Sequence, residues 1–289
     1  MSWGCIALNI QMKATSLATY KEYSSGAVMT FKVNYDSIAA AFDRRYREND
    51  YSGVESALRT FVGTESTGRV LEVGCGTGHW LRLLNEEAIR VCGVDPSRNM
   101  LAFARTTAPD AALAQGSAEQ LPWGDRTFDR VFCINALHHF GDKLGFLREA
   151  HRVLAPGGQM MTVGLDPHSG ADRWYIYEYF ESVLAIDKLR YPASRQIREW
   201  MHGLEYLNVR TSEVQHLPVR LSARAALEEG RLDKNVTSQL ALLSDEEYER
   251  GLERIRRALE SADTLGESLY LTADLRLHAT FGSVPFESA

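Results

Sequence analysis

The stretch VLEVGCGTGHW joins one acidic residue to three closely spaced glycines. Glu72 lies within the hydrophobic run, and Gly74, Gly76 and Gly78 follow at every second position. Glycine has no Cβ, so a turn of this kind lets a ligand approach the backbone closely. The pattern therefore predicts a ligand site where the hydrophobic run ends.

Neither common phosphate-binding motif fits this stretch. His79 stands in place of the third glycine of a GxGxxG dinucleotide fingerprint, and the chain has no GxxxxGK[ST] string. A pyrophosphate would also face the carboxylate of Glu72. The stretch therefore argues against a nicotinamide-dependent dehydrogenase and favours a ligand that carries an ammonium group and no phosphates.

Two further polar positions follow later hydrophobic runs. Asp95 ends the next run, and a carboxylate there can accept hydrogen bonds from both hydroxyls of a ribose. Ser117, Ala118 and Glu119 follow the third run, where polar groups would meet the edge of an adenine. An adenosine with a cationic amino-acid tail satisfies all three features. The ligand inferred is S-adenosyl-L-methionine, with S-adenosyl-L-homocysteine as its product.

The elements that must position these residues alternate between strand and helix. Helical apolar spacing marks residues 34–46, 55–62, 79–86, 97–106 and 144–154, and strand-like runs mark 69–74, 90–95, 111–116, 128–135 and the stretch after Ala155. This order is typical of a parallel sheet with helices on both faces. Residues 271–281 instead alternate strictly between apolar and polar side chains, which indicates an antiparallel strand.

Two stretches interrupt the alternation on the carboxyl side of the expected sheet, and we expect both to form a lid. The first contains the aromatic-rich, helical DRWYIYEYF, and the second holds at least two helices, one opening at Ser244 and Glu247 with capping-box spacing. The organisation predicted is an N-terminal extension (1–30), a cofactor-binding core (31–165), a lid insertion (166–192), more core (193–218), a helical lid insertion (219–264), and a terminal strand and tail (265–289).

Four features together resemble the class I S-adenosylmethionine-dependent methyltransferases. They are ExGxGxG, Asp95, FDRVFCINALHHF and LREAHRVLAPGG, and the likeness covers residues 34–164, closest to the group of ubiquinone and menaquinone biosynthesis methyltransferases. The resemblance implies an α/β, Rossmann-like sheet of seven strands, mostly parallel with an antiparallel last strand. It places the sixth and seventh strands near 207–216 and 269–281.

The resemblance also implies which residues bind the cofactor. The methionine part would contact Glu72, Gly74, Cys75, Gly76, Thr77 and Gly78, and the ribose would contact Asp95, which lies beside Pro96 and Met100. The adenine would contact Ser117, Ala118 and Glu119, and the methyl group would lie beside Asn135 and Ala136. Met100 also suits packing within its own helix. Tyr35 and Tyr46, in the first predicted helix, are candidates to close over the cofactor.

The methyl acceptor is expected beyond the fourth and fifth strands. His138 and His139 follow the fourth, and Asp166 and His168 follow the fifth, so these four are the candidate catalytic residues, as bases or as groups that orient the acceptor. Packing and loop roles stay open for them. INALHHF is not the Asn/Asp-Pro-Pro-aromatic string of many enzymes that methylate amino groups. Cys133 follows Phe132 rather than a proline, so the chain lacks the Pro-Cys pair of enzymes that methylate base carbons through a cysteine. The several exposed cysteines that arsenic methylation would need are also missing from the pattern. These absences favour a small-molecule acceptor.

Composition narrows the class further. The net charge of −6 disfavours a large nucleic-acid surface, and no apolar run is long enough for a membrane span. The four cysteines lack metal-ligand spacing and suit a reducing cytoplasm. The function predicted is methyl transfer to an O, N, C or S atom of a small, partly apolar metabolite, without a metal. Methylation of a macromolecule and cofactor binding without turnover stay open, as does the oligomeric state.

Overall fold

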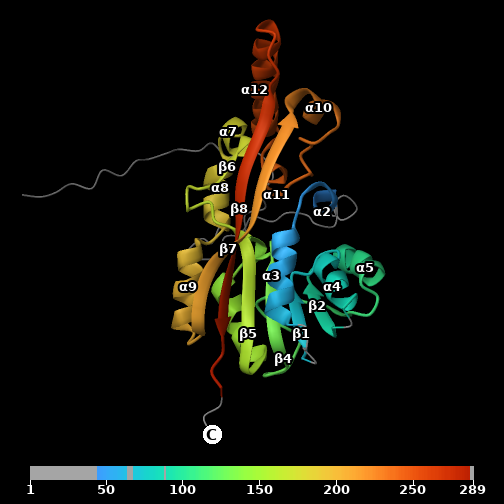
Figure 1. Ribbon diagram of the computed structural model, residues 1–289, viewed down its shortest axis with the longest axis vertical. Helices are drawn as coiled ribbons and strands as arrows, with labels where there is room; N and C mark the ends of the chain where they lie inside the picture. The colour runs from blue at the N-terminus through green and yellow to red at the C-terminus, as the bar shows by residue number, and fades with distance from the viewer. Residues whose placement is uncertain (1–43, 64–67, 88, 287–289) are drawn as a thin grey trace, which may run out of the picture.

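The computed structural model describes residues 44–63, 68–87 and 89–286, and the sheet within them has eight strands (Figure 1). Their spatial order is β3-β2-β1-β4-β5-β8-β6, and β7 pairs with β8. The strands are β1 (Val70–Val73), β2 (Val91–Asp95), β3 (Ala112–Gln115), β4 (Phe128–Ile134), β5 (Leu154–Leu165), β6 (Arg173–Trp174), β7 (Leu207–Ser222) and β8 (Tyr270–Ser283).

The helices connect these strands in the predicted alternation. They are α2 (Arg44–Glu48), α3 (Ser52–Val62), α4 (His79–Asn85), α5 (Arg98–Thr107), the 3₁₀ turn η2 (Leu137–His139), α6 (Lys143–Val153), α7 (Tyr175–Tyr179), α8 (Val183–Arg190), α9 (Ser194–Gly203), α10 (Ala223–Glu228), α11 (Ser238–Ala241) and α12 (Asp245–Thr264). Most of the predicted first helix lies outside the described residues, and α2 is the part that is described.

The strand directions confirm the predicted fold class. Strands β1 to β5 pair in parallel, and β8 runs antiparallel to both β5 and β7. The sheet differs from the prediction in having eight strands rather than seven. The additional strand, β6, lies within a segment predicted to be helical. The pairing of β5 with β8 ends at Leu165 and Leu277, which leaves the next part of that edge of β8 open to β6.

Strands β7 and β8 form a long two-stranded ribbon that extends beyond the rest of the sheet (Figure 1). β7 continues to Ser222, past the expected end at residue 216. The helices α10 and α12 lie at the far end of the ribbon, with α7 beside it. Helix α12 begins as predicted, because Ser244 and Glu247 form a reciprocal capping box. Helices α7, α10 and α12 belong to the two segments that we expect to form the lid.

Two buried clusters, one on each face, hold the helices against the sheet. Leu58 of α3 and Leu81 of α4 belong to one cluster, and Phe146 of α6 and Met201 of α9 belong to the other. The apolar face of β8 is buried as its alternation predicted, through Leu271, Ala273, Leu275, Leu277 and Ala279. This cluster continues along the ribbon to α7 and α12, so the ribbon and the sheet share one core.

Candidate cofactor and methyl-acceptor site

The glycine turn joins β1 to α4 at the carboxyl edge of the sheet. Gly74, Gly76 and Gly78 have φ angles of 76°, 52° and 84°, a region that other residues rarely adopt. A Cβ built on Gly74 would lie 2.5 Å from the Cβ of Ala136. The turn is held to the next strand, because Gly74 N donates to the Val94 carbonyl over 2.8 Å. The sequence needs glycine here for both conformation and space.

Glu72 places a buried carboxyl group beneath this turn. The residue is 1% exposed, and its Oε2 has no hydrogen-bond partner among the described residues. Burial is the main cause that raises its pKa well above the usual range, Asp95 adds to the effect, and Arg45 opposes it. A buried carboxyl oxygen without a donor matches the ammonium group of a bound amino acid, which would satisfy it and favour its charged form.

Asp95 ends β2 beside the glycine turn and organises the local backbone. Its Oδ2 accepts from Gly76 N and its Oδ1 from Ser97 N, each over 2.9 Å. Ser97 in turn caps α5, because its hydroxyl accepts from Met100 N. Each carboxylate oxygen has a second lone pair, so Asp95 can still accept from ribose hydroxyls. Met100 is 1% exposed and packs in the core, the packing role that its helical pattern suggested.

The remaining candidate cofactor residues line the same edge of the sheet. Ser117 donates to Glu119 after β3, and Glu119 Oε1 accepts from Gly141 N over 2.8 Å, which ties this loop to the one after η2. Asn135, at the end of β4, has a φ of 51°, a left-handed conformation typical of functional turns. Four further candidate residues are buried: Cys75, Thr77, Ala118 and Ala136. Pro96 is exposed.

Helix α2 covers the start of α4 next to the glycine turn. The ring of Tyr46 stacks on that of His79 with centroids 3.7 Å apart, and Arg45 Nη2 donates to the Tyr46 hydroxyl over 2.8 Å. Burial raises the pKa of Tyr46 to about 12, so this phenol stays neutral. His79, the residue that breaks the dinucleotide fingerprint, thus provides the ring on which α2 packs. Tyr35 lies outside the described residues.

The two candidate histidines form η2, directly after β4. His138 is buried, and its Nε2 lies 3.0 Å from the Tyr191 hydroxyl, while His139 Nδ1 lies 3.4 Å from Arg190 Nη2. Burial is the first cause that lowers the pKa of both imidazoles well below the usual value, and the nearby Arg190 adds to it. Both rings are therefore neutral at pH 7.

Asp166 and His168 lie in the loop after β5, where their side chains bind the backbone. Asp166 Oδ2 accepts from Ser194 N at the start of α9 over 2.8 Å, and its Oδ1 accepts from His168 N. His168 Nε2 lies 2.9 Å from the Tyr191 carbonyl. These contacts favour a structural role in shaping the loop beside Tyr191. A catalytic role for either residue stays a prediction.

The sequence did not reveal a buried ion pair behind the histidines. Arg190 Nη1 donates to Asp187 Oδ1 over 3.1 Å, and the side chains are 1% and 0% exposed. Charges three residues apart on a helix normally indicate a solvent-facing pair. Their burial depends on the covering segment around Gln239, whose amide nitrogen donates to Asp187 Oδ2 over 3.1 Å. No local sequence pattern predicts the contact between Gln239 and Asp187.

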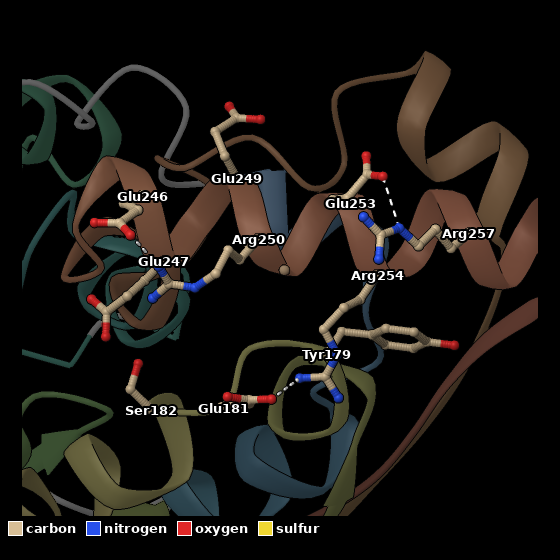
Figure 2. Close-up of a pocket in the computed structure, with 11 residues that line it drawn as sticks. Tyr179, Glu181, Ser182, Glu246, Glu247, Glu249, Arg250, Glu253, Arg254 and Arg257 are labelled. Atoms are coloured by element: carbon tan, nitrogen blue, oxygen red, sulfur yellow. Dashed lines mark hydrogen bonds and ion pairs between the residues drawn. The ribbon is translucent and has the colours of Figure 1, made fainter.

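A separate cavity of about 700 Å³ lies between α12 and the α7–α8 turn (Figure 2). Its charged side chains largely pair with one another, as Arg254 does with Glu181 and Arg250 with Glu246. None of the candidate cofactor or acceptor residues lines it. The lining holds five glutamates and three arginines, so the cavity carries an excess of negative charge, and it is distinct from the site at the sheet edge.

Metal sites and membrane spans would indicate other classes of function. Residues 44–63, 68–87 and 89–286 contain no group of three His, Cys, Asp or Glu side chains that could hold a metal ion. No helix within those same ranges has the length and apolar character needed to cross a membrane.

The chain is similar to known proteins in sequence and in fold. A family described as "Methyltransferase domain" matches residues 71–162. "Probable phthiotriol/phenolphthiotriol dimycocerosates methyltransferase 2" of Mycobacterium ulcerans is 31% identical over 184 residues, which are 61% of this chain and 69% of that protein. Demethylmenaquinone methyltransferase of Staphylococcus epidermidis is 31% identical over 147 residues, 48% of this chain and 61% of that protein.

A solved structure supports the same fold. Phosphoethanolamine N-methyltransferase 2 of Haemonchus contortus, in complex with S-adenosyl-L-methionine, superposes with a TM-score of 0.56 at 19% identity. The match covers 86% of this chain and 57% of that one. At this identity the likeness concerns the fold alone.

Proposed function

The chain belongs to the S-adenosylmethionine-dependent methyltransferases, and we propose that it transfers a methyl group to an O, N, C or S atom of a small, partly apolar metabolite. The observation that carries the proposal is the buried Glu72 carboxyl oxygen without a partner, set beneath a glycine turn and beside Asp95. This arrangement suits the amino-acid end and the ribose of the cofactor.

The chain's own residues provide binding, orientation and exclusion of water. The bound cofactor supplies an electrophilic methyl group on a sulfonium. Glu72 holds the ammonium, Asp95 holds the ribose, and Ser117, Ala118 and Glu119 border the adenine. Helix α2 would close over the cofactor, a role that the stacking of Tyr46 on His79 supports. Holding two reactants in line can contribute about 7–11 kcal/mol of a barrier in favourable cases.

A small-molecule acceptor has support from charge and from the relatives. Both relatives carry small molecules in their names, phthiotriol or phenolphthiotriol dimycocerosates and demethylmenaquinone. The net charge of −6 disfavours a nucleic-acid acceptor. The lid formed by 166–192 and 219–264 would then give the acceptor site its specificity, because such segments vary freely on this scaffold. We place the enzyme in the cytoplasm, a location that the free thiols Cys75, Cys92 and Cys133 support.

The decisive experiment follows a labelled methyl group. The protein is incubated with S-adenosylmethionine carrying the label and an extract of its source cells, and the products are separated by size. Label in the small-molecule fraction is the expected result and yields a compound to identify. Label in protein or RNA would replace the metabolite with a macromolecular acceptor. Absence of label with cofactor binding intact would favour a binding protein without turnover. Glu72→Gln serves as the control, because it is expected to weaken cofactor binding and so to reduce the label transferred.

A further inference from the structure

A chain of buried hydrogen bonds runs from the lid to His138. It begins at the Asp187 carboxylate on α8 and passes through Gln239 on α11 and Tyr191 to the imidazole after β4. Gln239 Nε2 lies 3.1 Å from Asp187 Oδ2 and 3.1 Å from the Tyr191 oxygen, and that oxygen lies 3.0 Å from His138 Nε2. The rings of Tyr191 and His138 also stack, with centroids 3.9 Å apart. Two segments of the lid thus meet at one candidate catalytic side chain.

The donors along this chain have a fixed direction. Arg190 Nη1 and the Tyr177 hydroxyl also donate to Asp187, over 3.1 and 3.0 Å. A carboxylate only accepts, so the Gln239 atom that faces Asp187 is its NH₂ group. The same NH₂ group gives its second proton to the Tyr191 oxygen. Tyr191, whose oxygen accepts from Gln239, can then direct its own proton to His138 Nε2, so that Nε2 accepts.

The consequence for His138 is a defined tautomer. Because Nε2 accepts, the neutral ring carries its proton on Nδ1. Burial lowers the pKa of this imidazole first, and the surrounding cationic or titratable side chains lower it further; these are His139, Arg190, Arg45 and Lys143. Nδ1 takes part in no hydrogen bond among the described residues, and the side chain is 8% exposed. An Nδ1 proton would therefore have no protein acceptor among the described residues.

We propose that Gln239 and Tyr191 are positioning residues that fix His138 as the Nδ1–H tautomer, which makes His138 a hydrogen-bond donor, rather than a proton acceptor, in the methyl-acceptor site. The assignment of that site rests on the proposed function, whereas the tautomer does not. A donor of this kind selects an acceptor that presents an oxygen with free lone pairs, such as a phenolate, an enolate or a carbonyl. Such an acceptor reaches His138 already able to react, or loses its proton elsewhere.

The test is nitrogen NMR of the full-length protein labelled with ¹⁵N-histidine, with His138→Gln identifying the His138 signals. The expected wild-type spectrum shows a neutral ring protonated at Nδ1, and it stays neutral when the pH falls to 6. A proton on Nε2, or titration near the ordinary histidine pKa of about 6.5, would overturn the proposal.

The variant Gln239→Glu reverses the direction of the chain. Two carboxyl groups against each other share a proton, so Glu would donate to Asp187 and accept from the Tyr191 hydroxyl. Tyr191 then turns its proton away from His138, and the ring switches to the Nε2–H tautomer. The matched control is Tyr177→Phe, which removes a donor to Asp187 but leaves the Gln239–Tyr191–His138 chain intact and should retain Nδ1–H.

Two further readings keep the outcome decisive. If Gln239→Glu folds and His138 keeps Nδ1–H, the proposal is wrong. If it fails to fold, Tyr191→Phe decides, because removing the hydroxyl must allow the Nε2–H form to appear. Calorimetry with S-adenosylmethionine on the same samples tests the proposed function separately. If the wild type does not bind S-adenosylmethionine, the proposed function is wrong, whereas the tautomer result is unaffected.

Discussion

Replacing Glu72 with glutamine should separate cofactor binding from folding. The carboxyl group is buried, and its Oε2 has no donor among the described residues, so the free protein gains little from its charge. A bound ammonium would form a charge-assisted hydrogen bond with it, worth about 1.5–3 kcal/mol. Since 1.4 kcal/mol is about tenfold in affinity, we expect Glu72→Gln to weaken binding of S-adenosylmethionine roughly 10- to 150-fold.

The stability of the same variant should move in the opposite direction. Burial, followed by the charge of Asp95, raises the pKa of Glu72 in the folded protein above its value in the unfolded chain. The folded state therefore binds the Glu72 proton more tightly than the unfolded chain does. The stability that this bound proton contributes is lost as the pH rises through the raised pKa. Glutamine does not ionise, so the free energy of unfolding at pH 8 should be unchanged or higher in the variant.

The pH dependence of binding gives a third readout. The ammonium of the cofactor favours the ionised carboxylate, so binding to the wild type should release a proton and tighten as the pH rises toward the raised pKa. Titration calorimetry in two buffers of different ionisation enthalpy measures that release directly. Equal affinity in wild type and Glu72→Gln, with no release of a proton, would refute the assignment of Glu72 to the ammonium.

Three further substitutions test other parts of the structure. Asp95→Ala should weaken cofactor binding at least tenfold by calorimetry, because the ribose and Gly76 N both lose an acceptor; unchanged affinity would rule out the ribose assignment. Gly74→Ala should lower the free energy of unfolding by about 1–3 kcal/mol for its backbone conformation and about as much again for crowding. Gly63→Ala, at a φ of 80° with no atom of the described residues within 4 Å of the new Cβ, should show the first effect alone in chemical denaturation, so equal losses would contradict the crowding. Ser244→Ala should cost about 1 kcal/mol of stability through loss of the capping box and leave the affinity for the cofactor unchanged; a weakened affinity would show that α12 reaches the cofactor site.

The glycine turn that we propose to bind the cofactor could be predicted because its signals are local. The strand, the glycine turn and the next helix are contiguous in sequence, and glycine at Gly74 is required by a positive φ and by the closeness of Ala136. Asp95 then follows from the rule that ligands bind at the carboxyl ends of parallel strands. The resemblance of these motifs to a known family supplied the remaining cofactor residues.

The acceptor half could not be predicted to the same depth. The sequence placed His138 and His139 after the fourth strand, but it gave no reason to join them to Arg190 or Gln239, which lie 51 and 101 positions further on from His139 and His138. The charges of α8 give no local sign of burial, and the two-residue β6 lies in a stretch that was predicted to be helical. Both features depend on a remote segment: α11 covers the ion pair, and the open edge of β8 receives β6.

The sequence by itself determined the fold class and the cofactor, and it indicated the edge of the sheet where we propose that the cofactor binds, because hydrophobic periodicity and glycine conformation act over a few residues. Only the tertiary structure decided which polar groups are buried together and in which direction their hydrogen bonds run. Burial sets the pKa of Glu72 and of His138, and burial depends on contacts between segments that the chain brings together only when it folds.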